Sequence, residues 1–168
     1  MGGILVLALY GVRHHYAAQF PYGERRAAML IMYYALLNYA NDHAGSFPAD
    51  ENAYVALTKL YPHYCPTGAE LAGLSVDETK TKERLLTGKP LDGSTTSWIY
   101  LPGLKSGDDP RIALLWESQE GLRHSGRVSD NQSHAVLLVD GTITNIPGDI
   151  WAQFREEQRR LLGHAAGK

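Results

Sequence analysis

The side chains that could bind a metal ion gather in the last third of the sequence. Glu117, His124, Asp130, His134 and Asp140 follow one another around the segment that joins two strand-like runs. Because strand edges can bring Glu117, His134 and Asp140 together, these three are candidate ligands, for calcium or, with histidine, for a transition metal. In the competing interpretation, Glu117 and His124 brace the loop by hydrogen bonds and Asp140 belongs to a turn. We favour the second interpretation and expect no bound metal or cofactor.

The motifs of common enzyme classes do not occur in the sequence. The seven histidines lack the spacing of paired metal ligands, and there is neither a Gly-x-Ser-x-Gly nucleophile elbow nor a glycine-rich phosphate loop. The single cysteine, Cys65, excludes an internal disulfide framework and any metal site built from several cysteines. We expect Cys65 to be a small buried apolar residue. The sequence therefore predicts a protein that is not an enzyme.

The composition is close to the average of globular proteins. The chain has 168 residues, 44% of them hydrophobic and 20% charged, and a formal net charge of −2. These values exclude the disordered, collagenous and low-complexity classes, and the length is sufficient for a real core. Without a block of Lys and Arg, we expect no nucleic-acid partner. No apolar run reaches the roughly 20 residues of a membrane-spanning helix.

The first 23 residues form an apolar segment that precedes the main domain, residues 24–168. Residues 2–12 are almost wholly apolar, and no small-residue cleavage site of a secretory signal follows them. Three interpretations remain open: a buried helix, the membrane-proximal end of an anchor, and a segment that docks on a partner. The residues expected to contact lipid or another subunit are Ile4, Leu5, Leu7, Leu9 and Tyr10.

A long helix is predicted over residues 24–42. Residues 27–37 are eleven consecutive apolar residues, and a helix that is apolar on every side is buried on every side. One sheet covers only one face of a helix, so we expect the remainder to meet another chain or a membrane surface. The alternative is that other helices of the same domain enclose it. The expected contact residues on this helix are Met29, Leu30, Met32, Tyr33 and Leu36.

The second half of the chain predicts an antiparallel sheet of three to four strands. Asp140-Gly141 separates two β-prone runs and indicates a hairpin with a type I′ turn, in which both central residues have positive φ. The strand-like runs are residues 97–101, 111–117, 134–140 and 142–146.

Shorter helices complete the predicted fold. A short helix is expected over residues 52–62, and another near residues 78–86 within an otherwise irregular stretch. Gly45 is expected to cap the long helix that precedes them. An amphipathic helix over residues 149–162 closes the chain, and its apolar face consists of Ile150, Phe154, Leu161 and Leu162. A long helix, a sheet and a closing helix in this order make the fold class α+β.

Two stretches of the sequence carry a family resemblance. The first reads Leu-Leu-Asn-Tyr-Ala-Asn-Asp-His-Ala-Gly-Ser-Phe-Pro over residues 36–48 and continues with Leu-Tyr-Pro-His-Tyr-Cys-Pro over residues 60–66. The second begins with Tyr-Leu-Pro-Gly-Leu over residues 100–104 and ends with Ala-Val-Leu-Leu-Val-Asp-Gly over residues 135–141. In this order and spacing, they resemble the type IV pilin-like proteins, and more narrowly the type II secretion pseudopilins and their planctomycete-type relatives.

The resemblance implies a pilin-like fold and a structural function. In such a subunit, part of the long apolar helix lies in a membrane or between neighbouring subunits, and its far half packs on an antiparallel sheet. The implied location is the periplasmic or extracytoplasmic face of the inner membrane. However, the prepilin processing motif is absent, and Thr142 stands where the family usually has histidine. A pseudopilin-type fibre component and an accessory subunit that stabilises a larger membrane complex therefore both remain open, and a metal-dependent enzyme is the third alternative.

Overall fold

The computed structural model describes residues 28–121 and 132–165, which have an α+β fold. The sheet has four antiparallel strands in the order β1-β2-β3-β4, so each strand pairs with its neighbour in the sequence. This confirms the expected fold class and the antiparallel sheet. The strands are β1 (Trp98–Tyr100), β2 (Ala113–Glu117), β3 (His134–Leu138) and β4 (Ile143–Ile146).

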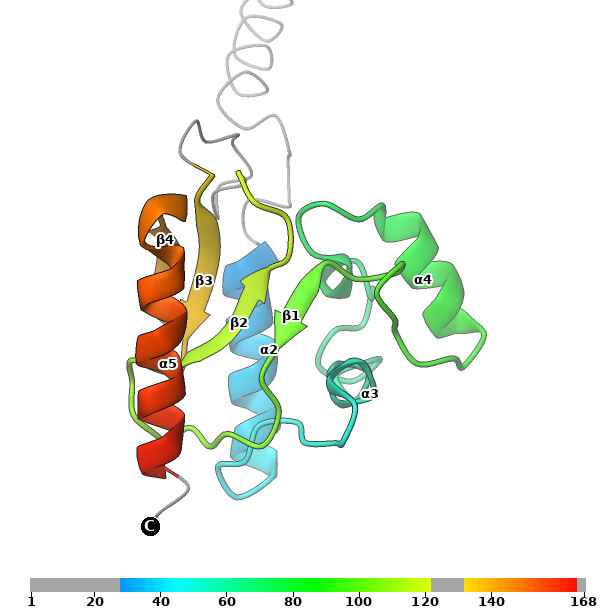
Figure 1. Ribbon diagram of the computed structural model, residues 1–168. Helices are drawn as coiled ribbons and strands as arrows, with labels where there is room; N and C mark the ends of the chain where they lie inside the picture. Colours follow the sequence, from blue (N-terminus) through cyan, green and yellow to red (C-terminus); the bar gives the residue numbers. More distant parts are fainter. Residues whose placement is uncertain (1–27, 122–131, 166–168) are drawn as a thin grey trace, which may run out of the picture.

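Helices cover both faces of the sheet. They are α2 (Ala28–Asp42), α3 (Ala53–Thr58), α4 (Glu78–Leu86) and α5 (Trp151–Ala165), with the short 3-10 helices η2 (Glu70–Ala72) and η3 (Gly148–Ile150). Figure 1 shows α2 behind the sheet, α5 in front of it, and α3 and α4 beyond β1. Within the described residues, no helix is both long and apolar enough to cross a membrane.

α2 ends where the sequence predicts. Gly45 has a φ of +82°, and its N–H donates to the carbonyl of Ala40 at 2.7 Å. This left-handed glycine satisfies a carbonyl of the last helical turn, as a helix C-cap does. The part of the predicted helix before Ala28, and every expectation for residues 1–23, lies outside the described residues.

One side of α2 packs into the core and the other is exposed. Met29, Met32 and Leu36 are at most 1% exposed and belong to the main hydrophobic core. The large apolar side chains exposed on the other side are Leu30 (43%), Ile31 (39%) and Tyr34 (55%). The alternative in which the domain itself encloses the whole helix is therefore wrong for the described residues.

The short helices α3 and α4 are both capped by side chains. Asn52 accepts a hydrogen bond from the N–H of Tyr54 at 2.8 Å, and Asp77 accepts one from the N–H of Thr79 at 2.9 Å. α4 lies where the sequence predicts it. α3 is shorter than the predicted helix over residues 52–62, because the N–H groups of Lys59, Leu60 and Tyr61 donate to carbonyls three residues back and the chain continues as tighter turns.

The β3–β4 hairpin forms as predicted but with a different turn. Gly141 has a φ of +87°, whereas Asp140 keeps a negative φ. The N–H of Gly141 donates to the carbonyl of Leu138 at 3.0 Å, and the N–H of Leu138 donates to the carbonyl of Thr142 at 2.9 Å. This pattern is a three-residue loop with one left-handed glycine rather than a type I′ turn. Asp140 stabilises it by accepting a hydrogen bond from the N–H of Thr142 at 2.8 Å.

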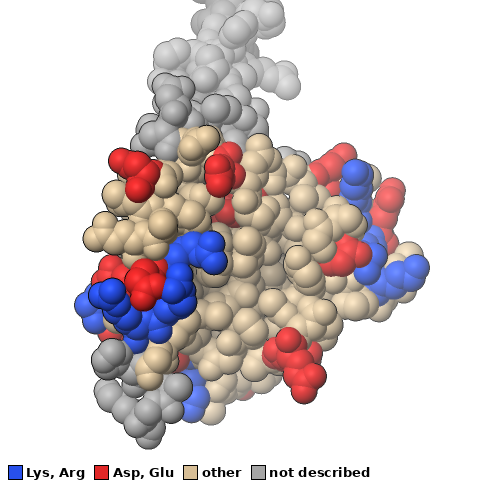
Figure 2. Space-filling view, viewed as in Figure 1, with Lys and Arg blue, Asp and Glu red and all other residues tan. Residues whose placement is uncertain are grey.

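The closing helix half-buries three residues of the predicted apolar face, Phe154, Leu161 and Leu162, but not the fourth, Ile150. Ile150 lies in η3, before α5 begins, and is 45% exposed. Trp151 takes the inward position instead and stacks on Phe154 with ring centroids 5.4 Å apart. Charged side chains gather over the outer side of α5 and near α4, and leave the middle of the face in Figure 2 nearly free of charge.

Candidate functional site

Glu117, the first candidate ligand, is the one carboxylate that is fully buried among the described residues. Its Oε2 accepts hydrogen bonds from the N–H of Leu74 at 2.8 Å and from the hydroxyl of Ser97 at 2.9 Å. Its Oε1 accepts one from the hydroxyl of Ser75 at 2.7 Å. Because these donors come from the segment after η2 and from the residue just before β1, Glu117 joins the irregular middle of the chain to the sheet.

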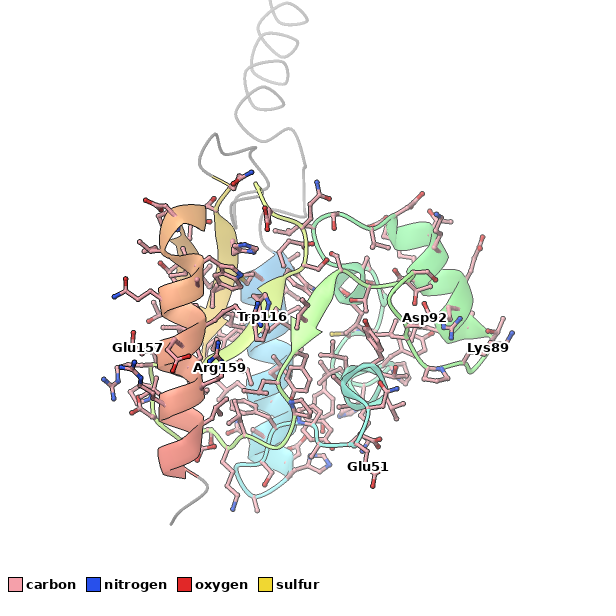
Figure 3. All side chains as sticks on the ribbon, viewed as in Figure 1. Glu51, Lys89, Asp92, Trp116, Glu157 and Arg159 are labelled. Carbon is pink, nitrogen blue, oxygen red and sulfur yellow. The ribbon has the colours of Figure 1, made fainter. Side chains whose placement is uncertain are left out.

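His134 lies on the other face of the sheet, below α5. Its ring stacks on Trp151 with centroids 3.8 Å apart, and Trp116 meets Trp151 edge-on at 6.5 Å. Trp116 lies over the sheet beside α5 in Figure 3. Adjacent residues of a strand point to opposite faces, so Glu117 points away from the face that carries Trp116 and His134.

The structure therefore does not bring the three candidate ligands together. Glu117 and His134 lie on opposite faces, and Asp140 lies beyond the far end of β3, a strand about 13 Å long. Among residues 28–121 and 132–165, no group of three or more His, Cys, Asp or Glu side chains could hold a metal ion. His124 and Asp130 lie outside the described residues.

Asp140 belongs to a turn, as the structural interpretation expects. Glu117 departs from that interpretation, because its hydrogen bonds join it mainly to Leu74, Ser75 and Ser97 and only one, from the N–H of Gln119 at 3.3 Å, comes from the loop that follows it.

Burial lowers the pKa of His134 from its ordinary value of 6.5. The desolvation of the ring below α5 disfavours its charged form. Glu120 acts in the opposite direction, since its Oε1 lies 3.9 Å from Nε2 of His134, but the effect of burial is larger. The folded protein therefore favours a neutral imidazole at this position.

We expect this histidine to destabilise the fold as the pH falls below about 6.5. The unfolded chain takes up a proton near the ordinary pKa, whereas the folded chain takes it up only at lower pH, so acidification favours the unfolded state in that interval. Urea unfolding of the wild type and of His134→Phe, which keeps a stacking ring, measures the effect. Between neutral and mildly acidic pH, the free energy of unfolding should fall further for the wild type than for His134→Phe. Equal losses would contradict the prediction.

Cys65 is buried, as the sequence predicts, with 1% of its surface exposed. Burial raises the pKa of its thiol to about 12, and the charge of Glu70 acts in the same direction. Because alkylating reagents attack the thiolate, we expect iodoacetamide to leave Cys65 of the folded protein unmodified near pH 8. The same reagent should modify it fully in guanidinium chloride, and intact-mass measurement distinguishes the two. Rapid modification of the folded protein would show that the thiol is accessible.

The exposed side of α2, which we name the outer stripe, is a candidate binding surface because three of the large exposed apolar side chains lie on it. α2 carries no charged residue before Asp42, whereas the exposed face of a surface helix is usually charged or polar. Leu37 at the centre of the stripe is half-buried, and the two asparagines are exposed. The outer stripe consists of Leu30, Ile31, Tyr34, Leu37, Asn38 and Asn41.

The expected contact residues of α2 divide between this stripe and the core. Leu30 belongs to the stripe. Tyr33 is half-buried at its margin, where its hydroxyl donates to the carbonyl of Asp140 at 3.3 Å. The other three are core residues of this chain and are not accessible to a partner: Met29, Met32 and Leu36.

Sequence reasoning missed Ile31 and Tyr34 as exposed residues. Both lie inside the apolar run of residues 27–37, in which every position is apolar. Tyr34 could have been predicted from its spacing of four residues from Leu30, because residues four apart lie on the same side of a helix. The expected contacts at residues 4–10 lie outside the described residues.

Comparison with known proteins adds no relative. No protein-family model matches the chain, no curated protein matches it, and no solved structure matches it. The resemblance to pilin-like proteins therefore stays a prediction from the sequence, and the function has to be argued from the described surface.

Proposed function

We propose that this protein is a non-catalytic structural subunit of a bacterial membrane-associated assembly outside the cytoplasm, and that it contacts other subunits through the outer stripe of α2. The observation that supports this is the exposure of Leu30, Ile31 and Tyr34 on neighbouring positions of one helix. Single exposed apolar residues are normal on protein surfaces. A contiguous apolar patch is typical of a surface that binds a protein or a membrane.

The resemblance to pseudopilins makes the proposal more specific. A pseudopilin-type subunit has a helix with one side on an antiparallel sheet and further apolar surface for neighbours. The packing of Met29, Met32 and Leu36 into the core and the exposure of Leu30 and Tyr34 are consistent with this arrangement. In this proposal, residues 4–10 contact lipid or a neighbouring subunit at the periplasmic face of the inner membrane.

The experiment compares how much of the full chain is recovered in membranes and assembled particles after cell fractionation. Leu30→Ser/Tyr34→Ser replaces two apolar residues of the outer stripe. The matched control is Leu86→Ser, because Leu86 is 76% exposed but lies at the end of α4. We expect the double variant to be released into the soluble fraction about tenfold more than the control, which corresponds to about 1.4 kcal/mol of lost contact free energy.

Two results would contradict the proposal. In one, the wild type is a free monomer that does not associate with membranes. In the other, the stripe variant assembles as well as Leu86→Ser does. If the chain does assemble, electron microscopy separates the two kinds of subunit. A filament of this chain alone supports the pseudopilin-type fibre, and co-purification with unrelated proteins at fixed stoichiometry supports the accessory subunit.

A further inference from the structure

α5 covers its face of the sheet without burying side chains of its own. Within residues 151–163, the part of α5 whose side chains the structure describes, the large apolar residues are half-buried and none is buried. α2, in contrast, has six buried residues. Most of the stability of a helix in a protein comes from the packing of its apolar face, and elements that bury little apolar surface open locally at a low free energy. α5 can therefore leave the sheet more easily than α2 can.

The face of the sheet below α5 is nevertheless buried. Val136 is 0% exposed and His134 is 5% exposed, and because they lie two residues apart on β3 they point to the same face. The ring of Trp151, the first residue of α5, stacks on the ring of His134 with centroids 3.8 Å apart. α5 is thus part of what keeps water away from His134.

His134 lacks the hydrogen bonds that would support a charge. Its Nδ1 is buried and has no hydrogen-bond partner among the described residues. Its Nε2 lies 3.9 Å from Oε1 of Glu120, which is beyond hydrogen-bond distance. A protonated imidazole has an N–H donor at both ring nitrogens, and a buried donor of a charged group is unfavourable without an acceptor. Protonation therefore favours any arrangement in which the ring reaches water.

The surroundings of His134 act on its charge in both directions. Burial, the largest effect, and the charge of Arg155 disfavour the protonated ring, whereas the carboxylate of Glu120 and the main chain of Glu117 favour it, and the net result is a lowered pKa. The neighbouring strand β4 has no charged residue, and Asp149 of η3 is exposed. Arg155 and the ring that stacks on His134 both belong to α5. Moving α5 away therefore removes the charge and part of the burial that oppose protonation.

We propose that protonation of His134 releases α5 from the sheet, so that α5 is a pH-sensitive strap over this face. At neutral pH the uncharged ring stacks on Trp151 and the strap is closed. As the pH falls below about 6.5, the ordinary pKa of an exposed histidine, the open form takes up a proton before the closed form does, so acidification favours opening. Release brings the ring into water and uncovers Val136, while the core on the α2 side stays packed.

Gln158 attaches α5 to the sheet through groups that do not titrate. Its carboxamide accepts a hydrogen bond from the N–H of Ala113 at 2.8 Å and donates one to the carbonyl of Arg111 at 3.2 Å. These bonds join the second half of α5 to the chain at the start of β2. Gln158→Ala should therefore loosen the strap by the same factor at neutral and at acidic pH, which makes it a control for the effect of the proton.

Hydrogen exchange of the full chain at about pH 7.5 and about pH 5.5 tests the switch across the titration range of histidine. The readout is the protection factor of the α5 amides, corrected for the intrinsic effect of pH on exchange, relative to that of α4. α4 lies beyond β1 in Figure 1 and contains no histidine. In the wild type we expect α5 to lose at least about threefold in protection relative to α4 on acidification, because acid favours the local opening of α5.

Two variants remove the titrating ring. They are His134→Phe, which keeps a ring for stacking, and His134→Gln, which is smaller and polar, so one remains informative if the other fails to fold. In both, the protection of α5 relative to α4 should be equal at the two pH values. Gln158→Ala should lower it at both and keep the further loss in acid.

Two results would overturn the inference. In one, the His134 variants lose as much protection of α5 in acid as the wild type does, so His134 is not the group that responds. In the other, α5 and α4 of the wild type lose protection equally, which would show a general loss of stability rather than the release of α5.

The switch is independent of the proposed function, because α5 and α2 lie on opposite faces of the sheet (Figure 1). Normal assembly of Leu30→Ser/Tyr34→Ser would contradict the proposed function and leave the switch intact. Unchanged exchange of α5 in acid would contradict the switch alone.

Discussion

Glu117→Ala should lower the free energy of unfolding by about 2 to 4 kcal/mol, because it removes the buried acceptor of several hydrogen bonds and leaves a cavity. The substitution removes the acceptor of the N–H of Leu74 and of the hydroxyl of Ser75, whereas the hydroxyl of Ser97 keeps the carbonyl of Ala72 at 3.2 Å as an acceptor. Unsatisfied buried donors cost about 1 to 3 kcal/mol each. The effect should be largest where the segment after η2 meets β1, so hydrogen exchange at the N–H of Leu74 should accelerate most.

Urea unfolding followed by circular dichroism measures this effect against a matched control. Glu120 lies a few residues further along the same segment, but its side chain is 59% exposed, so Glu120→Ala should cost less than about 1 kcal/mol. Glu117→Gln, which keeps one acceptor oxygen, should fall between the two. A loss of less than 1 kcal/mol in Glu117→Ala would show that the buried carboxylate does not hold the middle of the chain to the sheet.

Gly141→Ala should lower the free energy of unfolding by about 2 to 4 kcal/mol, from backbone strain and overpacking together. Gly141 has a φ of +87°, and a Cβ added there would lie 2.4 Å from the ring of Tyr33. The hydroxyl of Tyr33 donates to the carbonyl of Asp140 at 3.3 Å, so the ring of Tyr33 lies against the β3–β4 turn. A side chain at position 141 would therefore displace the ring of Tyr33 from the β3–β4 turn.

Gly103→Ala separates the two causes of this loss. Gly103 has a similar φ of +85°, but a Cβ there would meet nothing within 4 Å. Gly103→Ala should thus show the backbone strain alone, about 1 to 2 kcal/mol. The difference between the two variants in urea unfolding measures the contact with Tyr33. If Gly141→Ala were no worse than Gly103→Ala, α2 would not be held at this turn.

Local signals were enough to predict many of the elements. Asp77 and Asn52 are capping residues, and Gly45 is a typical helix end, so α4, the start of α3 and the end of α2 could be located from neighbours in the sequence. The Asp-Gly pair at residue 140 indicated the hairpin. These features depend on hydrogen bonds between residues a few positions apart, so the types of neighbouring residues are enough to predict them.

The three candidate metal ligands do not meet, because a shared site would require Glu117 and His134 to point to the same face of the sheet. Glu117 and His134 lie on paired strands and are close along the sheet, as expected. Which face each side chain takes follows from the register of β2 against β3, in which Trp116 pairs with Val136. A change of one residue in that register would have turned His134 to the other face. Register is decided by long-range packing, so spacing in the sequence could not predict it.

The apolar run of residues 27–37 by itself determined that a helix here would carry more apolar surface than one sheet can cover. It could not determine which side stays outside, because a helix that is apolar all round has no preferred face. Only the tertiary structure decided this, when the sheet packed against Met29, Met32 and Leu36 and left Leu30 and Tyr34 exposed. The physical reason is that burial is favourable for each of these side chains, and the shape of the facing sheet selects among them.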